Sequence, residues 1–417
     1  MMHHSFEILH WGFDALYIAF QGAVSEATRR ALRDAKVRAM DAGEPIFAKI
    51  AGLSGHVGDT GATGGYRYRF EQGPLAAKWL FKENSDPNEW NLWAEIPASA
   101  LAEFGIMHCI DLLRDDLRAM DGRILNEAVN RFDVCVDINS DGFIPSPKNI
   151  SVHSHTRVKQ HYGDDKHDAR KLEVVGAGKN IQTITIGKMP SRQISIYDKR
   201  REATYSQKSI WWEIWGRKKD DLKNPVWRVE IRFGKKALKS VNVETLDDVL
   251  AKGASMITDA MNDCRYLICE NTDEIRADRV PTHPFWKFAH EALMQFSGGP
   301  AEGANTGNIK HIIRTDHINM LEKQAIGLLK TLAALRGDFP DDKAAKQYSR
   351  ERNSFTANLF KHLDYRLSKM DSEEWTEFET GIHDARDKYH FITETEKGSE
   401  VLARQNQMRE IYGETRN

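Results

Sequence analysis

Apolar and polar residues alternate along several short stretches in the first part of the chain. A period of two places successive side chains on opposite faces of a strand, so each stretch predicts a strand with one buried face. Turn-forming residues separate the stretches, which favours a mostly antiparallel sheet. The clearest predicted strands cover residues 15–20, 132–138, 182–186, 193–197 and 227–233.

Helical spacing of apolar residues occurs between these strands. It predicts one helix over residues 99–118 and another over residues 246–267, the second beginning at the capping pair Thr245 and Asp248. The combination predicts an α+β fold in which helices flank the sheet. The glycine-rich segment DTGATGG at 59–65 lacks the Lys-Ser/Thr ending of a phosphate-binding loop and precedes a strand-like stretch. We interpret it as a hairpin turn.

The pattern changes after about residue 285. Small and turn-forming residues dominate FSGGPAEGANTG, as they do in linkers. We therefore predict a domain over residues 1–285, a linker over 286–307 and a small all-α C-terminal domain over 308–417.

Three helices are expected in this C-terminal domain. They cover residues 309–336, residues 343–369 and a segment that begins at the capping pair Asp371 and Glu374. DNA recognition, partner binding and dimerisation are all compatible with such helices, and their spacing does not choose between these roles.

Composition sets limits on the class of protein. A chain of 417 residues with 41% hydrophobic content can bury a large core. It has no apolar run long enough to span a membrane and no secretory signal pattern at its start, so we expect a cytoplasmic protein. The four cysteines do not have the spacing of a disulfide framework or a zinc site.

The formal net charge of −2 conceals a strong asymmetry. Residues 147–240 contain 22 Lys or Arg against 10 Asp or Glu, a balance of +12 that leaves −14 for the rest of the chain. One part of the protein could therefore face a polyanion such as nucleic acid. The alternative is a solvated basic surface.

The segment QISIYDKRRE is a candidate catalytic strand. Alternation places Tyr197 and Lys199 on its polar face, and Arg200 and Arg201 follow. A phenol beside cations can attack phosphorus, and these cations could hold the phosphate. The alternative is an exposed tyrosine that pairs across the sheet with a neighbouring strand.

Two further strands carry acidic residues on their polar faces. RFDVCVDIN aligns Asp133 with Asp137, and WRVEIRF presents Glu230. Clustered carboxylates without cysteine suit Mg²⁺ or Mn²⁺, which can neutralise charge on a phosphodiester. The alternative is a network of ion pairs between these three carboxylates and the neighbouring arginines Arg131, Arg228 and Arg232.

Two other motifs admit two interpretations each. His153 and His155 would face the same way on a strand and could bind a divalent ion, or they could be ordinary exposed or DNA-facing histidines. The segment WWEIW lies beside Arg217, Lys218 and Lys219. Its tryptophans could stack extruded bases, but helical spacing of Trp211 and Trp215 favours packing in a core.

The order of these motifs resembles that of the trans-acting replication initiation factors of rolling-circle plasmids, phages and integrative elements (the Rep_trans family). The resemblance runs through FDALYIAF, RFDVCVDIN, TITIGKMPSRQISIYDKRRE and VWRVEIRFGKKAL, over about residues 10–240. Its most specific part is the IYDK-x-x-E string followed by R-x-E-x-R. It ends before the C-terminal helices.

The resemblance implies a nicking-endonuclease-like fold and a DNA-nicking and rejoining activity. Tyr197 would form a 5′-phosphotyrosine and leave a free 3′-OH, with a divalent ion, Mg²⁺ or Mn²⁺, held by acidic residues. Asp133, Asp137 and Glu230 are the first candidates for ligands. Further candidates for contacts with metal or DNA are Asp14, Asp198 and Glu202, and Arg228 and Arg232 are predicted to contact DNA.

The expected partners are origin DNA, single-stranded at the nick, a host helicase and a second copy of the chain, but not a membrane. Two other classes of function stay open. A mobilisation relaxase or recombinase would use the same tyrosine chemistry for transfer. A non-catalytic DNA-binding regulator would keep the basic face without cutting a strand.

Overall fold

The computed structural model describes residues 5–152, 172–177, 180–206, 208–268, 279–299, 302–335, 361 and 363–393. The chain divides into two compact units, Met1–Lys310 and His311–Asn417.

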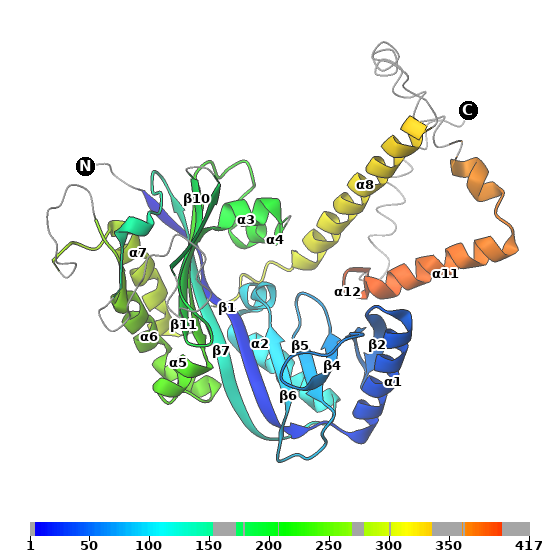
Figure 1. Cartoon of the computed structure of the whole chain (residues 1–417), viewed down its shortest axis with the longest axis horizontal. Coiled ribbons are helices and arrows are strands. Elements are labelled where there is room, and N and C mark those ends of the chain that lie inside the picture. The colour runs from blue at the N-terminus through cyan, green and yellow to red at the C-terminus, as the bar shows by residue number, and fades with distance from the viewer. Residues whose placement is uncertain are drawn as a thin grey trace, which may run out of the picture. The chain divides into compact units, whose positions relative to one another are not determined.

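The first unit is built around a large antiparallel sheet, which confirms the predicted fold class (Figure 1). The strand order is β2-β3-β4-β5-β6-β1-β7-β12-β11-β10-β9. The two middle strands, β1 and β7, have 18 residues each and link the two halves of the sheet. The strands are β1 Phe6–Ala23, β2 Ile46–Ile50, β3 Leu53–Val57, β4 Tyr66–Glu71, β5 Lys78–Lys82, β6 Trp90–Ile96, β7 Arg123–Ser140, β9 Leu172–Ala177, β10 Asn180–Gly187, β11 Arg192–Asp198 and β12 Val226–Gly234. A second, two-stranded sheet pairs β8 Ile150–Val152 with β13 Cys264–Tyr266.

Helices flank this sheet as predicted. The capping pair Thr245 and Asp248 begins a helix, but that helix ends at Asp263 because the next residues form β13. The DTGATGG segment connects β3 to β4, which pair antiparallel, so the hairpin interpretation is confirmed. The helices of this unit are α1 Glu26–Ala42, α2 Ala98–Ala119, α3 Lys199–Tyr205, α4 Ile210–Ile214, α5 Lys235–Ser240, α6 Leu246–Asp263 and α7 Pro284–Leu293.

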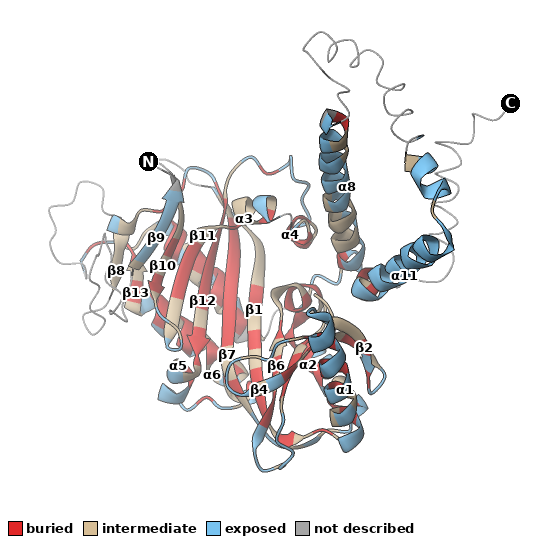
Figure 2. Ribbon diagram, turned by 45° about the vertical axis from the view of Figure 1, so that its right-hand side comes forward, coloured by how far each residue is buried: buried red, intermediate tan, exposed pale blue. Residues whose placement is uncertain are grey.

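Alternation along the middle strands separates an apolar face from a polar face. On β7, Phe132, Val134 and Val136 are fully buried, and helices α5 and α7 pack against this strand. Phe132 stacks on Phe233 of β12 with ring centroids 4.8 Å apart, which joins the two strands on the apolar side. Figure 2 shows how continuous this burial is along β12. The charged residues of β7 and β12 therefore share the opposite face.

The predicted linker over residues 286–307 is part of the first unit. Trp286 and Phe296 are buried in its core, because α7 presents an apolar side to β1 and β7. Further along, the Glu103 carboxylate on α2 accepts hydrogen bonds from the backbone N–H groups of Thr306 and Gly307. Small and turn-forming residues at the end of this segment lie against α2 of the first unit.

The described part of the second unit is helical. Helix α8 spans Ile309–Leu335, starting just before the boundary between the units, and α11 spans Ser372–Lys388, followed by the short α12, His390–Thr393. The predicted capping pair Asp371 and Glu374 begins α11. Of the helix predicted over 343–369, residues 363–368 are described and helical, and most of the remainder lies outside the described residues. No helix in the described part of the chain is both long enough and apolar enough to cross a membrane.

Candidate functional site

Strand register aligns four polar residues across the centre of the sheet. His10 on β1 pairs with Asp137 on β7, Asp137 pairs with Arg228 on β12, and Arg228 pairs with Tyr197 on β11. Paired residues on neighbouring strands point to the same face. The row His10–Asp137–Arg228–Tyr197, which we call the central row, therefore brings together residues that are up to 218 positions apart in the sequence.

Arg228 is the hub of the central row. Its guanidinium donates two hydrogen bonds to Asp137, Nε to Oδ1 at 2.6 Å and Nη2 to Oδ2 at 2.7 Å. A third bond, from Nη1, reaches the Asp14 carboxylate at 2.6 Å. Burial alone would raise the pKa of Asp137, but Arg228 outweighs it and holds that pKa below its usual range.

A bulge places Asp14 beside this hub. The register between β1 and β7 shifts between Phe13 and Ala15, so Asp14 is an extra residue with no partner across the pair. Bulges of this kind re-aim a side chain. Phe13 and Leu16 both keep the apolar side, while Asp14 turns toward Arg228.

Tryptophans of α4 cover the central row. Trp211 lies 4.1 Å from the Arg228 guanidinium carbon, measured to the ring centroid, and Trp215 donates a hydrogen bond to Asp137 at 2.9 Å. Trp211 and Trp215 are 3% and 4% exposed, and Trp212 is also buried. The structure thus bears out the packing interpretation of WWEIW, and these rings are not available to stack extruded bases.

Tyr197 lies at the end of the central row, on the polar face of β11. The residue is half-buried, and burial raises the pKa of its phenol well above the usual range, although Arg228 opposes that shift. Among the residues that the structure describes, none forms a hydrogen bond with the Tyr197 hydroxyl. Within the described ranges, the Tyr197 hydroxyl is therefore not held by another side chain.

The Lys199 ammonium lies over the Tyr197 ring. It is 5.6 Å from the Tyr197 ring centroid and 4.3 Å from that of Trp211. Burial lowers the pKa of Lys199, and Arg228 lowers it further. Glu202, which is one turn along α3, accepts hydrogen bonds from both Lys199 and Lys208, so its carboxylate is shared between two ammonium groups.

The other predicted residues of this segment have different surroundings. Asp198 caps α3, because its carboxylate accepts a hydrogen bond from the Arg201 backbone N–H at 2.9 Å. The Arg201 guanidinium lies over the ring of Tyr205 at 4.8 Å. The Nε of Arg200 is buried and has no hydrogen-bond partner among the described residues. Arg200 thus has a buried donor without a partner among the described residues.

The three carboxylates predicted as metal ligands are all paired with guanidinium groups. Asp133 accepts from Arg131 at 2.8 Å and Glu230 accepts from Arg232 at 3.0 Å, while Asp137 is bound to Arg228. Within the described ranges, no three His, Cys, Asp or Glu side chains are arranged to hold a metal ion. This arrangement corresponds to the ion-network alternative and does not fit a preformed metal site.

The placement also bears on the predicted DNA contacts. Arg228 is 0% exposed, so in this arrangement it orders the site and does not face DNA. The side chain of Arg232 is partly exposed on the polar face, where a phosphate could reach it. The histidines His153 and His155 lie outside the described residues.

Sequence reasoning missed His10 and the hydrogen bond from Trp215. His10 has its Nε2 atom buried without a hydrogen-bond partner among the described residues, and burial lowers its pKa to about 4. It lies three strands from Tyr197, a distance of about 14 Å at ordinary strand spacing, so it does not touch the phenol. A lone histidine in the strand ILHWGFDAL gives no signal of this position.

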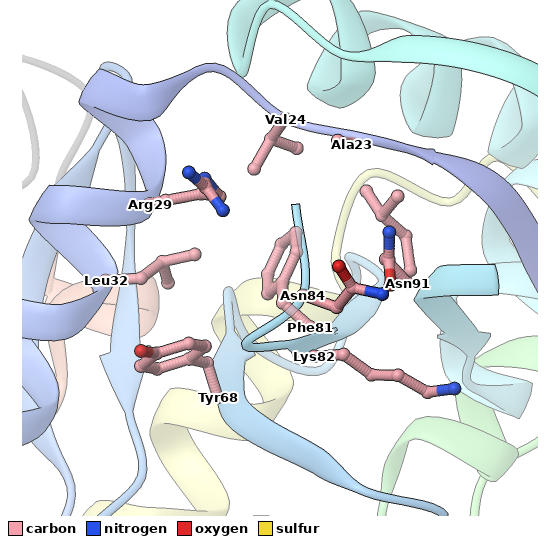
Figure 3. Close-up of a pocket in the computed structure, with 10 residues that line it drawn as sticks. Ala23, Val24, Arg29, Leu32, Tyr68, Phe81, Lys82, Asn84 and Asn91 are labelled. Atoms are coloured by element: carbon pink, nitrogen blue, oxygen red, sulfur yellow. The ribbon is translucent and has the colours of Figure 1, made fainter. Parts of the chain in front are cut away.

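A small, mostly apolar pocket lies elsewhere in the first unit (Figure 3). None of its lining residues belongs to the central row, and they present no carboxylate. It is lined by Ala23, Val24, Arg29, Leu32, Tyr68, Phe81, Lys82, Asn84, Asn91 and Leu92.

Comparison with known proteins gives little information. No family model matches the chain, and no curated protein matches its sequence. Among solved structures, the chain is similar to a rolling circle replication initiator protein from Geobacillus stearothermophilus, with 12% sequence identity and a TM-score of 0.35. The alignment covers 70% of this chain and 97% of that chain.

Proposed function

We propose that this protein nicks and rejoins DNA through Tyr197 and initiates rolling-circle replication, with a fold of the nicking-endonuclease type. The observation that carries the proposal is the position of Tyr197. Its phenol lies on the polar face of the sheet, makes no hydrogen bond with a described residue and is 5.6 Å, ring to ammonium, from Lys199. The motif order that resembles the replication initiation factors supports the same activity.

The proposed reaction is a transesterification. The Tyr197 hydroxyl oxygen attacks a backbone phosphorus, the bond from phosphorus to the 3′ oxygen breaks, and that oxygen leaves as a 3′-OH after taking up a proton. The 5′ phosphate stays on Tyr197, and the reverse reaction rejoins the strand. Because the phenol pKa is raised, its proton must leave during attack.

Three cations of this chain are candidates to stabilise the negative charge of the reacting groups. Lys199 is close enough to the Tyr197 ring to offset negative charge as the phenol loses its proton. Arg200, which follows Lys199 in α3, and Arg232, on the same face as Tyr197, are candidates to hold phosphate oxygens. Preorganised donors of this kind act most strongly where water is excluded.

We propose that a divalent ion, Mg²⁺ or Mn²⁺, takes part in the reaction when DNA is bound. The candidate carboxylates are bound to arginines, so a metal would have to displace those pairs or enter with the phosphates of the DNA. The assay therefore compares Mg²⁺, Mn²⁺ and a chelator.

The test is incubation of the full chain with supercoiled DNA from its own replicon. Wild-type protein should convert the supercoil to nicked circles and leave a covalent adduct on a peptide containing Tyr197. Tyr197→Phe should bind the DNA and form neither product. If Tyr197→Phe still forms the adduct, the nucleophile is misassigned.

A second candidate is a DNA-binding regulator that does not cut. The pairing of all three candidate carboxylates with arginine favours it, because such a network is complete without a metal. DNA binding without a nick under any of the three metal conditions would establish this alternative. A mobilisation relaxase or recombinase shares the proposed chemistry and differs in the fate of the nicked strand.

A further inference from the structure

Three aromatic side chains form a continuous chain on the sheet face that includes the polar residues of β7. The ring centroids of Tyr17 and Trp93 are 6.0 Å apart, and those of Trp93 and Tyr66 are 6.1 Å apart. All three residues are half-buried and retain exposed surface. We call Tyr17, Trp93 and Tyr66 the aromatic platform.

A cation lies at each end of the aromatic platform. The Arg131 guanidinium is over the Tyr17 ring at 5.0 Å, and the Lys82 ammonium is over the Tyr66 ring at 5.6 Å. In the middle, Glu95 is paired with Lys78 at 2.6 Å, so its negative charge is offset. Each cation covers one face of its ring, so Trp93 is the ring of the platform over which no described cation lies.

The helices of this half of the sheet lie against its other face. Trp79 and Lys78 are neighbours on β5, so their side chains point to opposite faces of the sheet. The Trp79 indole donates a hydrogen bond to Asp116 of α2 at 2.8 Å, which places α2 on the face opposite Lys78. Leu32 of α1 lines the pocket of Figure 3 together with Tyr68 and Phe81, which also belong to that face. Neither α1 nor α2 therefore covers the aromatic platform.

The aromatic platform is continuous with the central part of the sheet. Tyr17 pairs directly with Arg131 on β7, and the same guanidinium that lies over Tyr17 donates to Asp133 at 2.8 Å. Asp133 pairs with Arg232 of β12, on the face that carries Tyr197. A single strand of DNA bound across these residues would run from the aromatic platform toward Tyr197, the proposed nucleophile.

We propose that the aromatic platform binds single-stranded DNA by stacking a base on Trp93, the ring between Tyr17 and Tyr66, with Lys82 at the end of the platform to pair with a phosphate. Every base has a flat face, so stacking of this kind tolerates any sequence. Duplex DNA hides those faces and gains nothing from the rings. The proposal rests on the proposed function in one respect, because it names the platform as the surface that holds the strand beside Tyr197.

The test is fluorescence anisotropy of a labelled 16-nucleotide oligo-dT with the full chain, together with a duplex of the same length. Trp93→Ala should weaken single-strand binding about 10-fold or more, since stacking on one aromatic ring has an effect of this order. Trp93→Phe should retain most of the single-strand binding. Neither Trp93 variant should change the affinity for the duplex. Trp90→Ala is the matched control, because Trp90 is on the same strand, is 37% exposed and lies outside the platform.

Unchanged single-strand binding by Trp93→Ala would overturn the proposal. So would an equal loss with the duplex, or an equal loss in Trp90→Ala. Thermal unfolding of each variant shows whether the fold is intact. The two proposals fail separately: Tyr197→Phe tests the adduct and should leave oligonucleotide binding intact, whereas Trp93→Ala tests binding of an oligonucleotide without requiring cleavage.

Discussion

Arg228 and Asp137 form a two-pronged hydrogen-bonded ion pair in which both side chains have no exposed surface. Two charges taken out of water in this way are stabilising only while both partners are present. Asp14 and Trp215 complete the hydrogen bonds of the pair, so the centre of the sheet is a satisfied polar cluster within an otherwise apolar domain.

Removing one partner of this pair should destabilise the protein strongly. Arg228→Met leaves Asp137 buried without its counter-charge, and we expect a loss of about 3–5 kcal/mol in the free energy of unfolding, measured in urea. Arg228→Met combined with Asp137→Leu should recover much of that loss. Arg217→Met, which removes an exposed pair with Glu7, is the control and should cost under about 1 kcal/mol.

His10 should make stability depend on pH. Burial lowers its pKa to about 4, below the value of 6.5 for the unfolded chain, so the unfolded state binds more protons between these values. Stability should therefore decrease as the pH falls from about 6.5 to 4, with up to about 3 kcal/mol attributable to His10. Urea unfolding at several pH values should show that His10→Gln lacks this decrease in the free energy of unfolding between pH 6.5 and 4. A substitution at exposed His108 should leave the decrease unchanged. Parallel slopes for wild type and His10→Gln would contradict the prediction.

Lys199 should matter for the rate of nicking more than for DNA binding. We expect Lys199→Gln to slow adduct formation about 100-fold, because a cation close to the developing phenolate is removed. Lys208→Gln is a matched control, since Lys208 binds the same Glu202 carboxylate but its side chain is exposed. Equal rates for the two variants would remove Lys199 from the proposed chemistry.

The paired carboxylates imply weak metal binding in the absence of DNA. We expect the free protein to bind Mn²⁺ with a dissociation constant weaker than about 10⁻⁴ M, at the weak end of the range for oxygen ligands. Titration followed by the electron spin resonance of free Mn²⁺ would measure it. Tight binding that Glu230→Gln abolishes would show that the metal displaces Arg232 without help from DNA.

The segment that links α7 to α8 should contribute to the stability of the first unit. A Cβ atom at Gly303 would collide with the Glu103 backbone oxygen on α2, so Gly303→Ala should lower the free energy of unfolding by about 1–3 kcal/mol. Gly327→Ala, at a helical position where a Cβ meets nothing within 4 Å, is the control and should be neutral or stabilising. No loss for Gly303→Ala would mean that this segment is a true linker.

Local sequence patterns determined the elements and their faces. Alternation in RFDVCVDIN and WRVEIRF assigned each charged residue to the side of the strand on which the structure has it, because side-chain direction in a strand depends on position alone. Capping pairs at Thr245 and Asp371 located two helix starts for an equally local reason. The candidate nucleophile, its polar face and the α+β class all follow from such patterns.

Only the tertiary structure decided which residues meet. The central row depends on strand register, which is set by packing between segments far apart in the chain, so only the folded chain brings Asp137 against Arg228. The bulge that turns Asp14 toward Arg228 arises from the pairing of β1 with β7 and leaves no sequence signature. The end of the predicted linker lies against α2 for the same reason. Its small residues permit both a free linker and close contact with a helix, and only the folded chain selects between them.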